Sequence, residues 1–449
     1  MEPSPSNAPV IHRSFYILGM ILLAAGLIFG VIAAMQYLLP GFLKEELSFE
    51  RVRPLHASSV VFWIILAATG GVVTYLQQHT GRALRSLLLA RIQFYLFLVA
   101  IAAIMVSYFT GVFGGREYWE FPPVLSLPIV VAWILFIINF ILSVRSFRRQ
   151  PVYVWMWFTG LIFFLFTFSE SYLWLLPYFR NNVVNDMTIQ WKSYGSMVGA
   201  WNMLIYGCSI FLMDKISGNK TQSHSNMAFA LYFTGLFNLM FNWGHHIYTL
   251  PTHAYVKHIS YLVSMTELFI LGKIIWQWRS ALTAAMKYFH RYEYRFLAAA
   301  DVWIFLNLLL AILMSIPGIN VYTHGTHVTV AHSMGTTIGI NSFLLMAVGL
   351  DILQERRRLS LTSRSLITPA YWALNTGLLV FWISLIGAGV EKARWQMNKV
   401  QEPFAEMMDA LHPYFIALFF AGVLLAFSFL VLIYLILRNH AKGFAAGQP

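Results

Sequence analysis

The chain has 449 residues, of which 59% are hydrophobic, 16% are aromatic and only 11% are charged. Soluble domains carry about 25% charged residues, so this composition excludes an ordinary soluble protein and indicates a polytopic membrane protein. The formal net charge of +12 is explained by basic loops that face anionic lipid headgroups, and it gives no reason to expect a nucleic-acid partner.

Apolar segments follow one another along the chain, and each is long enough to cross about 30 Å of hydrocarbon as a helix. The twelve segments span residues 14–38, 57–77, 92–113, 124–144, 153–176, 194–213, 227–250, 258–278, 296–317, 327–350, 367–390 and 411–437. They are apolar nearly all round and much longer than the strands of a membrane barrel, so the predicted fold class is all-α. Because no repeat or linker divides the sequence, residues 1–449 are predicted to form one integral-membrane domain.

The basic residues between these segments predict how the chain is oriented. If the segments cross the membrane in turn, nineteen of the 30 Lys and Arg residues lie on the side of the N-terminus, and ten lie on the opposite side. This bias predicts that both termini are cytoplasmic. The first segment lacks a small-residue cleavage site, so we expect it to be a retained helix.

A single cysteine, Cys208, lies within the sixth segment. The chain therefore has no disulfide, no thiolate zinc site, no two-cysteine copper centre and no CxxCH haem attachment. Any redox centre must be held by histidine and its neighbours.

Three motifs place polar side chains at or within apolar segments. In chain order they are RVRPLHASSV with His56, WGHHIY with His245 and His246, and YTHGTHVTVAHSMG with His324, His327, His332 and Met334. A fourth motif, GREYWEFP with Glu117 and Glu120, lies in the connection between the third and fourth segments. A strongly polar side chain inside a span is costly unless it has a partner, so each such residue is a functional candidate. The alternative for a single histidine is a hydrogen-bonded group between helices.

The consecutive pair His245 and His246 closes the seventh segment. Neighbouring residues on a helix diverge by about 100°, so both imidazoles reach one metal only if the helix end is distorted. Gly244 and Pro251 permit that distortion. Imidazole binds iron, copper or zinc, so the pair predicts a buried non-haem metal site.

His332 and Met334 are two residues apart, and on a helix they would point about 200° away from each other. This spacing suits two flat cofactors on opposite sides of one helix, with one haem bound by His332 and another contacted by Met334. The alternative for Met334 is a methionine that fills a gap in the core.

In this order the motifs resemble the large, haem-bearing subunit of bacterial nitric oxide reductases, within the haem-copper oxidase superfamily, over essentially the whole chain. The resemblance implies a bundle like haem-copper oxidase subunit I, in which His56 binds a low-spin haem b and His332 binds a high-spin haem b3. It implies that His245 and His246 bind non-haem iron. The GREY motif implies that Glu117 and Glu120 lie near haem propionates and help to hold a calcium ion.

Two further positions favour a reductase over an oxidase. The nearest oxidases have a tyrosine for oxygen chemistry six residues before the histidine pair, where this chain has Leu239. Nitric oxide reductases have a functional glutamate twenty-one residues after the second histidine, which corresponds to Glu267. The resemblance implies that Glu267 passes protons, and the alternative is a hydrogen bond between helices.

Two departures from the family concern the metal ligands. The usual HxH is here His332, Ser333 and Met334, so the low-spin haem would have His56 and Met334 as axial ligands, and thioether ligation raises a haem potential. The family also supplies a third histidine for the non-haem metal from the sixth segment, yet no histidine or carboxylate occurs from Trp191 to Met213.

The metal site would thus hold only the histidine pair, unless Tyr194 or a residue from elsewhere completes it. A tyrosinate suits ferric iron, and the alternative for Tyr194 is a core aromatic side chain. Glu170 is another carboxylate within a predicted span, and the sequence assigns it no role.

The implied function is a respiratory enzyme of the bacterial cytoplasmic membrane that reduces two NO to N2O. Its electron donor would be a small membrane-anchored cytochrome c subunit or another periplasmic donor. Three questions stay open: whether the non-haem metal is iron or copper, whether quinol replaces the cytochrome, and whether the substrate is NO or O2. Two alternatives remain, namely an oxygen reductase or NO dismutase-like enzyme with an altered metal site, and a haem subunit for electron transfer or gas sensing without catalysis.

Overall fold

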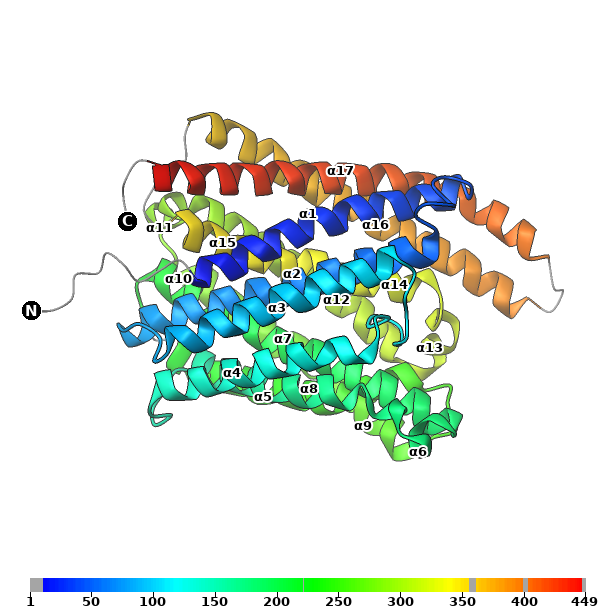
Figure 1. Cartoon of the computed structure of the whole chain (residues 1–449), viewed down its shortest axis with the longest axis horizontal. Helices are drawn as coiled ribbons and strands as arrows, with labels where there is room; N and C mark the ends of the chain where they lie inside the picture. Colours follow the sequence, from blue (N-terminus) through cyan, green and yellow to red (C-terminus); the bar gives the residue numbers. More distant parts are fainter. Residues whose placement is uncertain (1–10, 221, 355–360, 399–402, 446–449) are drawn as a thin grey trace, which may run out of the picture. The chain divides into compact units, whose positions relative to one another are not determined.

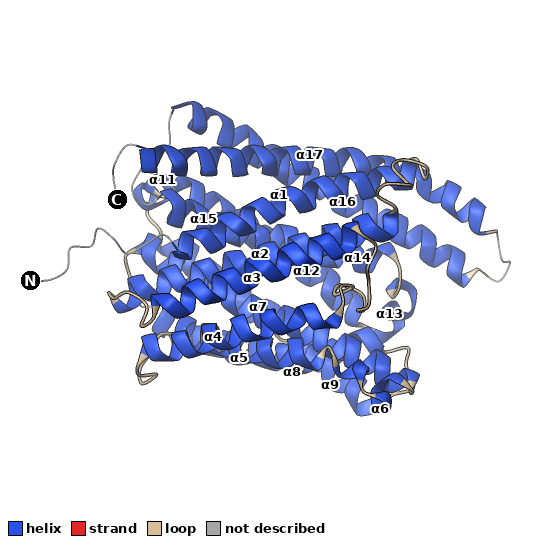
Figure 2. Cartoon of the chain, in the orientation of Figure 1, coloured by secondary structure: helices blue, strands red, loops and turns tan. Residues whose placement is uncertain are grey.

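Helices form nearly all the regular structure of the described chain. The computed structural model describes residues 11–220, 222–354, 361–398 and 403–445. Within these ranges it contains no β-strand (Figure 2), and its single isolated bridge joins Arg116 and Trp119. An all-helical chain is expected in a bilayer, because each helix satisfies its own backbone hydrogen bonds.

The chain divides into two compact units, each built from segments that are distant in sequence. The first unit comprises residues 1–135, 345–385 and 408–449, and the second comprises residues 136–344 and 386–407. The interpretation of the chain as one integral-membrane domain stays a prediction.

The first unit contains the N-terminal and C-terminal helices. Its helices are α1 (Ile11–Leu38), α2 (Phe49–Thr80), α3 (Leu87–Phe109), η2 (Pro123–Leu125), the first half of α4 (Ser126–Val144), most of α15 (Phe343–Gln354), the N-terminal part of α16 (Leu361–Met397) and most of α17 (Phe404–Ala445). Helix α1 packs along α2 (Figure 1). Gly26 permits this close packing, since a Cβ atom there would lie 2.8 Å from Cγ1 of Val60.

The second unit holds the central part of the chain. After the end of α4 its elements are α5 (Val152–Glu170), η3 (Leu173–Leu175), α6 (Pro177–Arg180), α7 (Val183–Ser217), η4 (Gln222–His224), α8 (Asn226–Phe241), η5 (Asn242–Ile247), α9 (Ala254–Ser264), α10 (Glu267–Ala281), α11 (Ala284–Phe289), α12 (Arg291–Ser315), α13 (Pro317–Thr323), α14 (His327–Met334) and the π-helix η6 (Gly335–Ser342). Helices α5 and α7 pack along each other (Figure 1).

Ten stretches of helix in the described ranges are long and apolar enough to cross a membrane. The other two predicted segments, 227–250 and 258–278, are each divided into shorter elements. The first consists of α8 followed by the 3-10 helix η5, and the second consists of α9 and α10. Non-helical backbone at membrane depth is tolerated where it is buried in protein or lines a cavity, and the first of these breaks carries the histidine pair.

Candidate metal centre

The histidine pair lies in η5, where the chain leaves the α-helical geometry of α8. The ring centroids of His245 and His246 are 4.1 Å apart, and the ring planes are inclined by 41°. Gly244 lets helix α9 approach closely, because a Cβ atom there would lie 2.9 Å from Cβ of Ser260. The local distortion expected from the sequence is therefore present, and it brings the two imidazoles side by side.

Two asparagines bind His245. Its Nδ1 lies 3.0 Å from Oδ1 of Asn242, the first residue of η5. From α13, Nδ2 of Asn320 donates to the carbonyl oxygen of His245 at 3.2 Å and to that of Met314 at 2.9 Å. The ring of His245 is thus held from within η5, and its backbone is tied to α13.

Aromatic stacking holds His246. Its ring stacks on Trp191 of α7, with centroids 5.1 Å apart and planes inclined by 13°. Gly195, one turn further along α7, leaves room for η5, because a Cβ atom there would lie 2.8 Å from Cβ of Trp243 and 3.8 Å from Cδ2 of His246. Helix α7 therefore forms one wall of the site.

Two further imidazoles of the second unit lie close enough for their charge to act on the pair. They belong to His332 of α14 and to His324, which caps the C-terminus of α13. The structure thus gathers the predicted ligands of the non-haem metal and the predicted ligand of haem b3 in one unit. The sequence had drawn attention to His324 only as part of its motif.

Helix α14 is held by the π-helical segment that follows it. Thr336 donates from Oγ1 to the carbonyl oxygen of His332 at 3.2 Å, and Nδ2 of Asn307 donates to Oγ1 of Thr336 at 2.7 Å. π-Helical turns occur frequently at functional sites. His332 and Met334 both lie in the regular α-helical part, as their predicted opposite orientation requires.

The described ranges contain no group of three histidine, cysteine, aspartate or glutamate residues that could hold a metal ion. Tyr194 is buried, with 8% exposure, and lies one turn after Trp191 on α7. Its role as a ligand stays a prediction. Glu267 is the first residue of α10, but its side chain lies outside the described part of the structure.

One buried oxygen on α7 is consistent with a bound group in the second unit. Asn202 follows Gly195 and Gly199 at helical spacing on the face that meets η5 and α8. Its Oδ1 is buried and has no hydrogen-bond partner among the described residues. A buried polar atom without a partner is costly, so this face of α7 offers an acceptor to a ligand or water.

His56 of the first unit has the surroundings of a metal-binding histidine. Its Nδ1 lies 2.7 Å from the carbonyl oxygen of Gly26 on α1. A carbonyl oxygen can only accept, so Nδ1 carries the proton and Nε2 is left with a free lone pair. Gly30 makes room for the ring, since a Cβ atom there would lie 2.8 Å from Nδ1. These residues fit a haem ligand. The pairing of His56 with Met334, which belongs to the second unit, stays a prediction.

The two carboxylates of the GREYWEFP loop share one arginine. Nη2 of Arg53 on α2 lies 2.7 Å from Oε1 of Glu120, and Nη1 lies 3.9 Å from Oε1 of Glu117. Arg53 is one turn before His56, so the loop is tied to the helix that carries that histidine. Burial raises the pKa of Glu120, while the charge of Arg53 opposes this shift. The predicted calcium ion would therefore join a site that already contains a cationic side chain.

Glu170, which the sequence left without a role, forms an ion pair with Lys192 between α5 and α7. Lys192 follows Trp191, the residue that stacks on His246. Sequence reasoning missed Trp191 because aromatic residues are common throughout these segments. It also missed Asn242, for which the spacing of three residues before His245 was an available signal.

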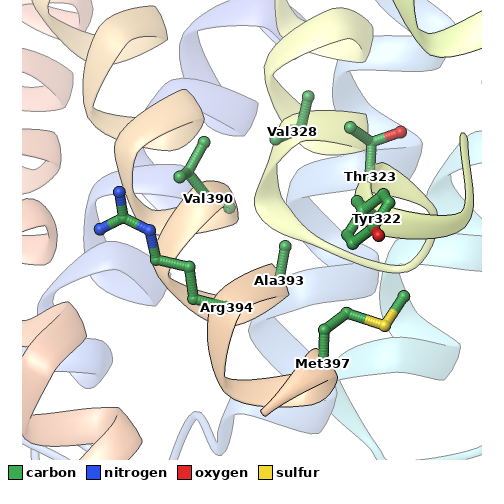
Figure 3. A pocket seen from close by; sticks show the side chains of 8 residues that line it. Tyr322, Thr323, Val328, Val390, Ala393, Arg394 and Met397 are labelled. Carbon is green, nitrogen blue, oxygen red and sulfur yellow. The ribbon is translucent and has the colours of Figure 1, made fainter. Parts of the chain in front are cut away.

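A cavity of about 330 Å³ lies beside the N-terminus of α14 (Figure 3). Its lining comes from α13, α14 and the C-terminal part of α16, all in the second unit. The lining residues are Tyr322, Thr323, Val328, Gly389, Val390, Ala393, Arg394 and Met397. Val328 is one turn before His332 on α14, so this mostly apolar cavity adjoins the helix that carries the predicted haem ligand.

The sequence matches the family described as Cytochrome C and Quinol oxidase polypeptide I over residues 10–424, which is most of the chain. The chain belongs to this family. Its members are the haem-copper oxidase subunits I, which are membrane oxidoreductases that bind haem and a metal centre. The chain is therefore a multi-pass membrane protein of this superfamily.

Individual relatives of this haem-copper oxidase subunit include both reductases and oxidases. A nitric oxide reductase subunit of Stutzerimonas stutzeri is 22% identical, and the alignment covers 93% of this chain and 92% of the relative. The Cbb3-type cytochrome c oxidase subunit CcoN1 of the same organism is 23% identical, with 92% of each chain covered. Identities this low identify a divergent member and leave its substrate open.

A solved structure of a heme-copper terminal oxidase dimer has the same fold. The TM-score is 0.74 at 17% identity, and the match covers 96% of this chain and 83% of the other. The predicted all-α, polytopic fold of haem-copper oxidase subunit I is therefore confirmed, and twelve helices is the number known for the family.

Proposed function

We propose that the chain is the catalytic subunit of a divergent nitric oxide reductase in the bacterial cytoplasmic membrane. The reaction is the reduction of two NO by two electrons and two protons to N2O and water. The observation that carries this choice is Leu239, in the position where related oxidases have a reactive tyrosine. Leu239 is 2% exposed and packs on α7. A Cβ atom added at Gly199 of α7 would lie 2.9 Å from Cβ of Leu239. An aliphatic side chain there cannot supply the phenol that oxygen chemistry uses.

The proposed cofactors follow from the histidines. His56 and Met334 would hold the low-spin haem b, His332 would hold the high-spin haem b3, and His245 with His246 would hold a non-haem iron or copper. When bound, the haem b3 and the second metal would supply electrons and two positions for NO. By holding both groups in one unit, His332 and the pair His245 and His246 would replace a chance encounter of two NO molecules by a fixed orientation. Proximity of the imidazoles of His245, His246 and His332 in the second unit supports this arrangement.

The remaining site residues have supporting roles in the proposal. Tyr194 is the candidate third ligand on α7, and Glu267 at the start of α10 would deliver protons. Glu117 and Glu120 would lie near the haem propionates, together with Arg53 and a calcium ion. The apolar cavity beside α14 (Figure 3) suits a small uncharged gas, which partitions into hydrocarbon more readily than an ion does.

The electron donor is proposed to be a small membrane-anchored cytochrome c subunit or another periplasmic donor. The sequence has one cysteine, Cys208, and so cannot attach a c-type haem through a CxxCH motif. The resemblance to cytochrome c oxidase subunits supports a cytochrome as the source. We therefore expect slow turnover of the purified chain with ascorbate and a mediator, and faster turnover when a reduced cytochrome c is added.

The test is gas analysis of the purified, haem-loaded protein with isotopically labelled NO and a reduced donor. The proposal predicts doubly labelled N2O. Labelled N2 together with O2 would instead identify an NO dismutase. Uptake of O2 without NO consumption would identify an oxygen reductase, as the similarity to the Cbb3-type subunit suggests. Bound haem without consumption of either gas would identify an electron-transfer or sensing subunit. The double variant His245→Ala, His246→Ala is the matched inactive control.

A further inference from the structure

We infer that Asn242 is a positioning residue that fixes the tautomer of His245, so that Nε2 of this histidine is the nitrogen available to the metal. The inference deepens the proposed function and rests on the non-haem metal centre that the proposal contains. It starts from one contact, the 3.0 Å approach of Oδ1 of Asn242 to Nδ1 of His245.

The direction of this hydrogen bond follows from the chemistry of the two groups. An amide oxygen can only accept, so Nδ1 of His245 must carry the proton. A neutral imidazole has one protonated nitrogen, and the lone pair then lies on Nε2. In the opposite tautomer Nε2 would present an N–H bond to the metal and could not bind it. Asn242 thus selects the tautomer that can act as a ligand.

The amide of Asn242 is itself held in place by helix α9. Ser264 donates from Oγ to Oδ1 of Asn242, and Ser260 donates from Oγ to the carbonyl oxygen of Asn242 at 2.8 Å. The two serines are one turn apart on α9, and Ser260 is fully buried. Oγ of Ser264 also lies 2.8 Å from the carbonyl oxygen of Ser260, so its single proton has two acceptors within reach. When the proton points to Asn242, it favours the orientation in which the oxygen of the amide, and not its NH2 group, faces His245.

The backbone completes the attachment. The backbone N–H of Asn242 donates to the backbone carbonyl oxygen of Asn238 in the last turn of α8. Gly244 allows α9 to come close enough for Ser260 to reach Asn242. Asn242 is therefore held through its backbone nitrogen, its backbone carbonyl oxygen and its side chain. Its contacts with α9 fix the place of the amide oxygen that faces the ring of His245.

The two histidines of the pair are constrained by different means. His246 stacks on Trp191, a contact that fixes the plane of the ring and does not choose between its nitrogens. His245 is held by a hydrogen bond, which chooses the nitrogen. Substitution of Asn242 should therefore change the behaviour of one bound imidazole and leave the other unchanged.

The test compares Asn242→Leu, which keeps the approximate volume and removes the acceptor, with Asn242→Asp, which keeps the acceptor and adds charge. Asn238→Leu is the matched control, because Asn238 is one turn earlier, is also half-buried, and donates from Nδ2 to the carbonyl oxygen of Thr234 on its own helix. The haem-loaded protein is depleted of non-haem metal and titrated with Fe²⁺ against a chelator of known affinity.

We expect Asn242→Leu to weaken Fe²⁺ binding by about 10- to 100-fold, which is the usual effect of losing a hydrogen-bond partner of a metal-bound histidine. Asn242→Asp should bind at least as tightly as the wild type, and Asn238→Leu should be unchanged. With Cu²⁺ in the site, pulsed electron paramagnetic resonance detects the remote nitrogen of each bound imidazole. Asn242→Leu should alter the signal of one remote nitrogen, and a merely structural effect would not.

The outcomes separate this inference from the proposed function. If the wild type binds one Fe²⁺ and Asn242→Leu binds it equally well with an unchanged nitrogen signal, the positioning role is wrong and the metal centre stands. If the wild type binds no non-haem metal, the proposed centre and the inference fail together. Should Asn242→Leu lose its haem or fail to fold, Ser264→Ala decides instead: the inference requires weaker Fe²⁺ binding in this variant, and wild-type affinity overturns it.

Discussion

The contact between α1 and His56 gives a sharp test of the low-spin haem site. Gly30 is one turn after Gly26 on α1, and a Cβ atom at position 30 would lie 2.8 Å from Nδ1 and 2.9 Å from Cε1 of His56. Ordinary contact begins at about 3.4 Å, so in Gly30→Ala the imidazole must move away from α1 by about 0.6 Å. That shift would lengthen the 2.7 Å hydrogen bond to the carbonyl oxygen of Gly26.

The cost can be worked out in two parts. Overpacking costs about 1–3 kcal/mol of folding free energy, and the gain in helix propensity from Gly to Ala returns up to about 1 kcal/mol. Loss of the hydrogen bond costs about 0.5–1.5 kcal/mol, which is roughly a 2- to 10-fold weakening of haem binding if the bond matters only in the loaded state. We therefore expect a modest loss of stability and a larger loss, or spectral shift, of the low-spin haem.

The assay measures haem per chain by the pyridine haemochrome method, together with the low-temperature spectrum and reduction potential of the low-spin haem. Gly422→Ala on α17 is the control, because the nearest heavy atom to a Cβ atom there is 3.6 Å away, on Phe381. If Gly30→Ala keeps the haem content, spectrum and potential of the wild type, His56 is not an iron ligand held through α1.

Three more substitutions test other parts of the site. Met334→His should lower the reduction potential of the low-spin haem in a potentiometric titration, since thioether ligation raises it; an unchanged potential would remove Met334 from the ligand set. Trp191→Leu removes the ring that stacks on His246, a contact worth about 0.5–1.5 kcal/mol. The affinity for the non-haem metal should therefore fall roughly 2- to 10-fold in a chelator competition. An affinity equal to that of the wild type would show that the stacking does not orient His246. Arg53→Gln removes the charge that lowers the pKa of Glu120, so this pKa rises further above 4.5. The folded variant therefore binds the proton of the Glu120 carboxyl more tightly than its unfolded state does. As the pH falls towards 4.5, the thermal midpoint of the variant should approach that of the wild type. A difference between the two midpoints that widens on acidification would contradict this assignment.

Hydropathy predicted where the chain crosses the membrane and was least accurate at the charged ends of helices. The second segment was expected to begin at residue 57, but α2 begins at Phe49. The additional turns contain Arg51 and Arg53, which a hydropathy window counts as loop. In the structure Arg53 is paired with Glu120 from a loop 67 residues away, a tertiary contact that the local sequence does not reveal.

The candidate site was predicted in part for a similar reason. Gly244 and the adjacent histidines indicated a distorted helix end, and the structure has a 3-10 helix there. The partners of the two rings come from elsewhere in the fold: the serines that hold Asn242 lie on α9, and Trp191 lies on α7. Serine and tryptophan are common in membrane helices, so only the packing of α7, α9 and η5 identifies these residues.

The arginine between the two glutamates of the GREYWEFP loop has a consequence for how this edge of the first unit responds to its surroundings. A calcium ion bound from solution dissociates when it is chelated or diluted. The guanidinium of Arg53 is covalently part of α2 and stays beside the two carboxylates. The negative charge of Glu117 and Glu120 is therefore partly balanced by the chain itself. Treatment with a calcium chelator should therefore leave this loop attached to α2 through Arg53.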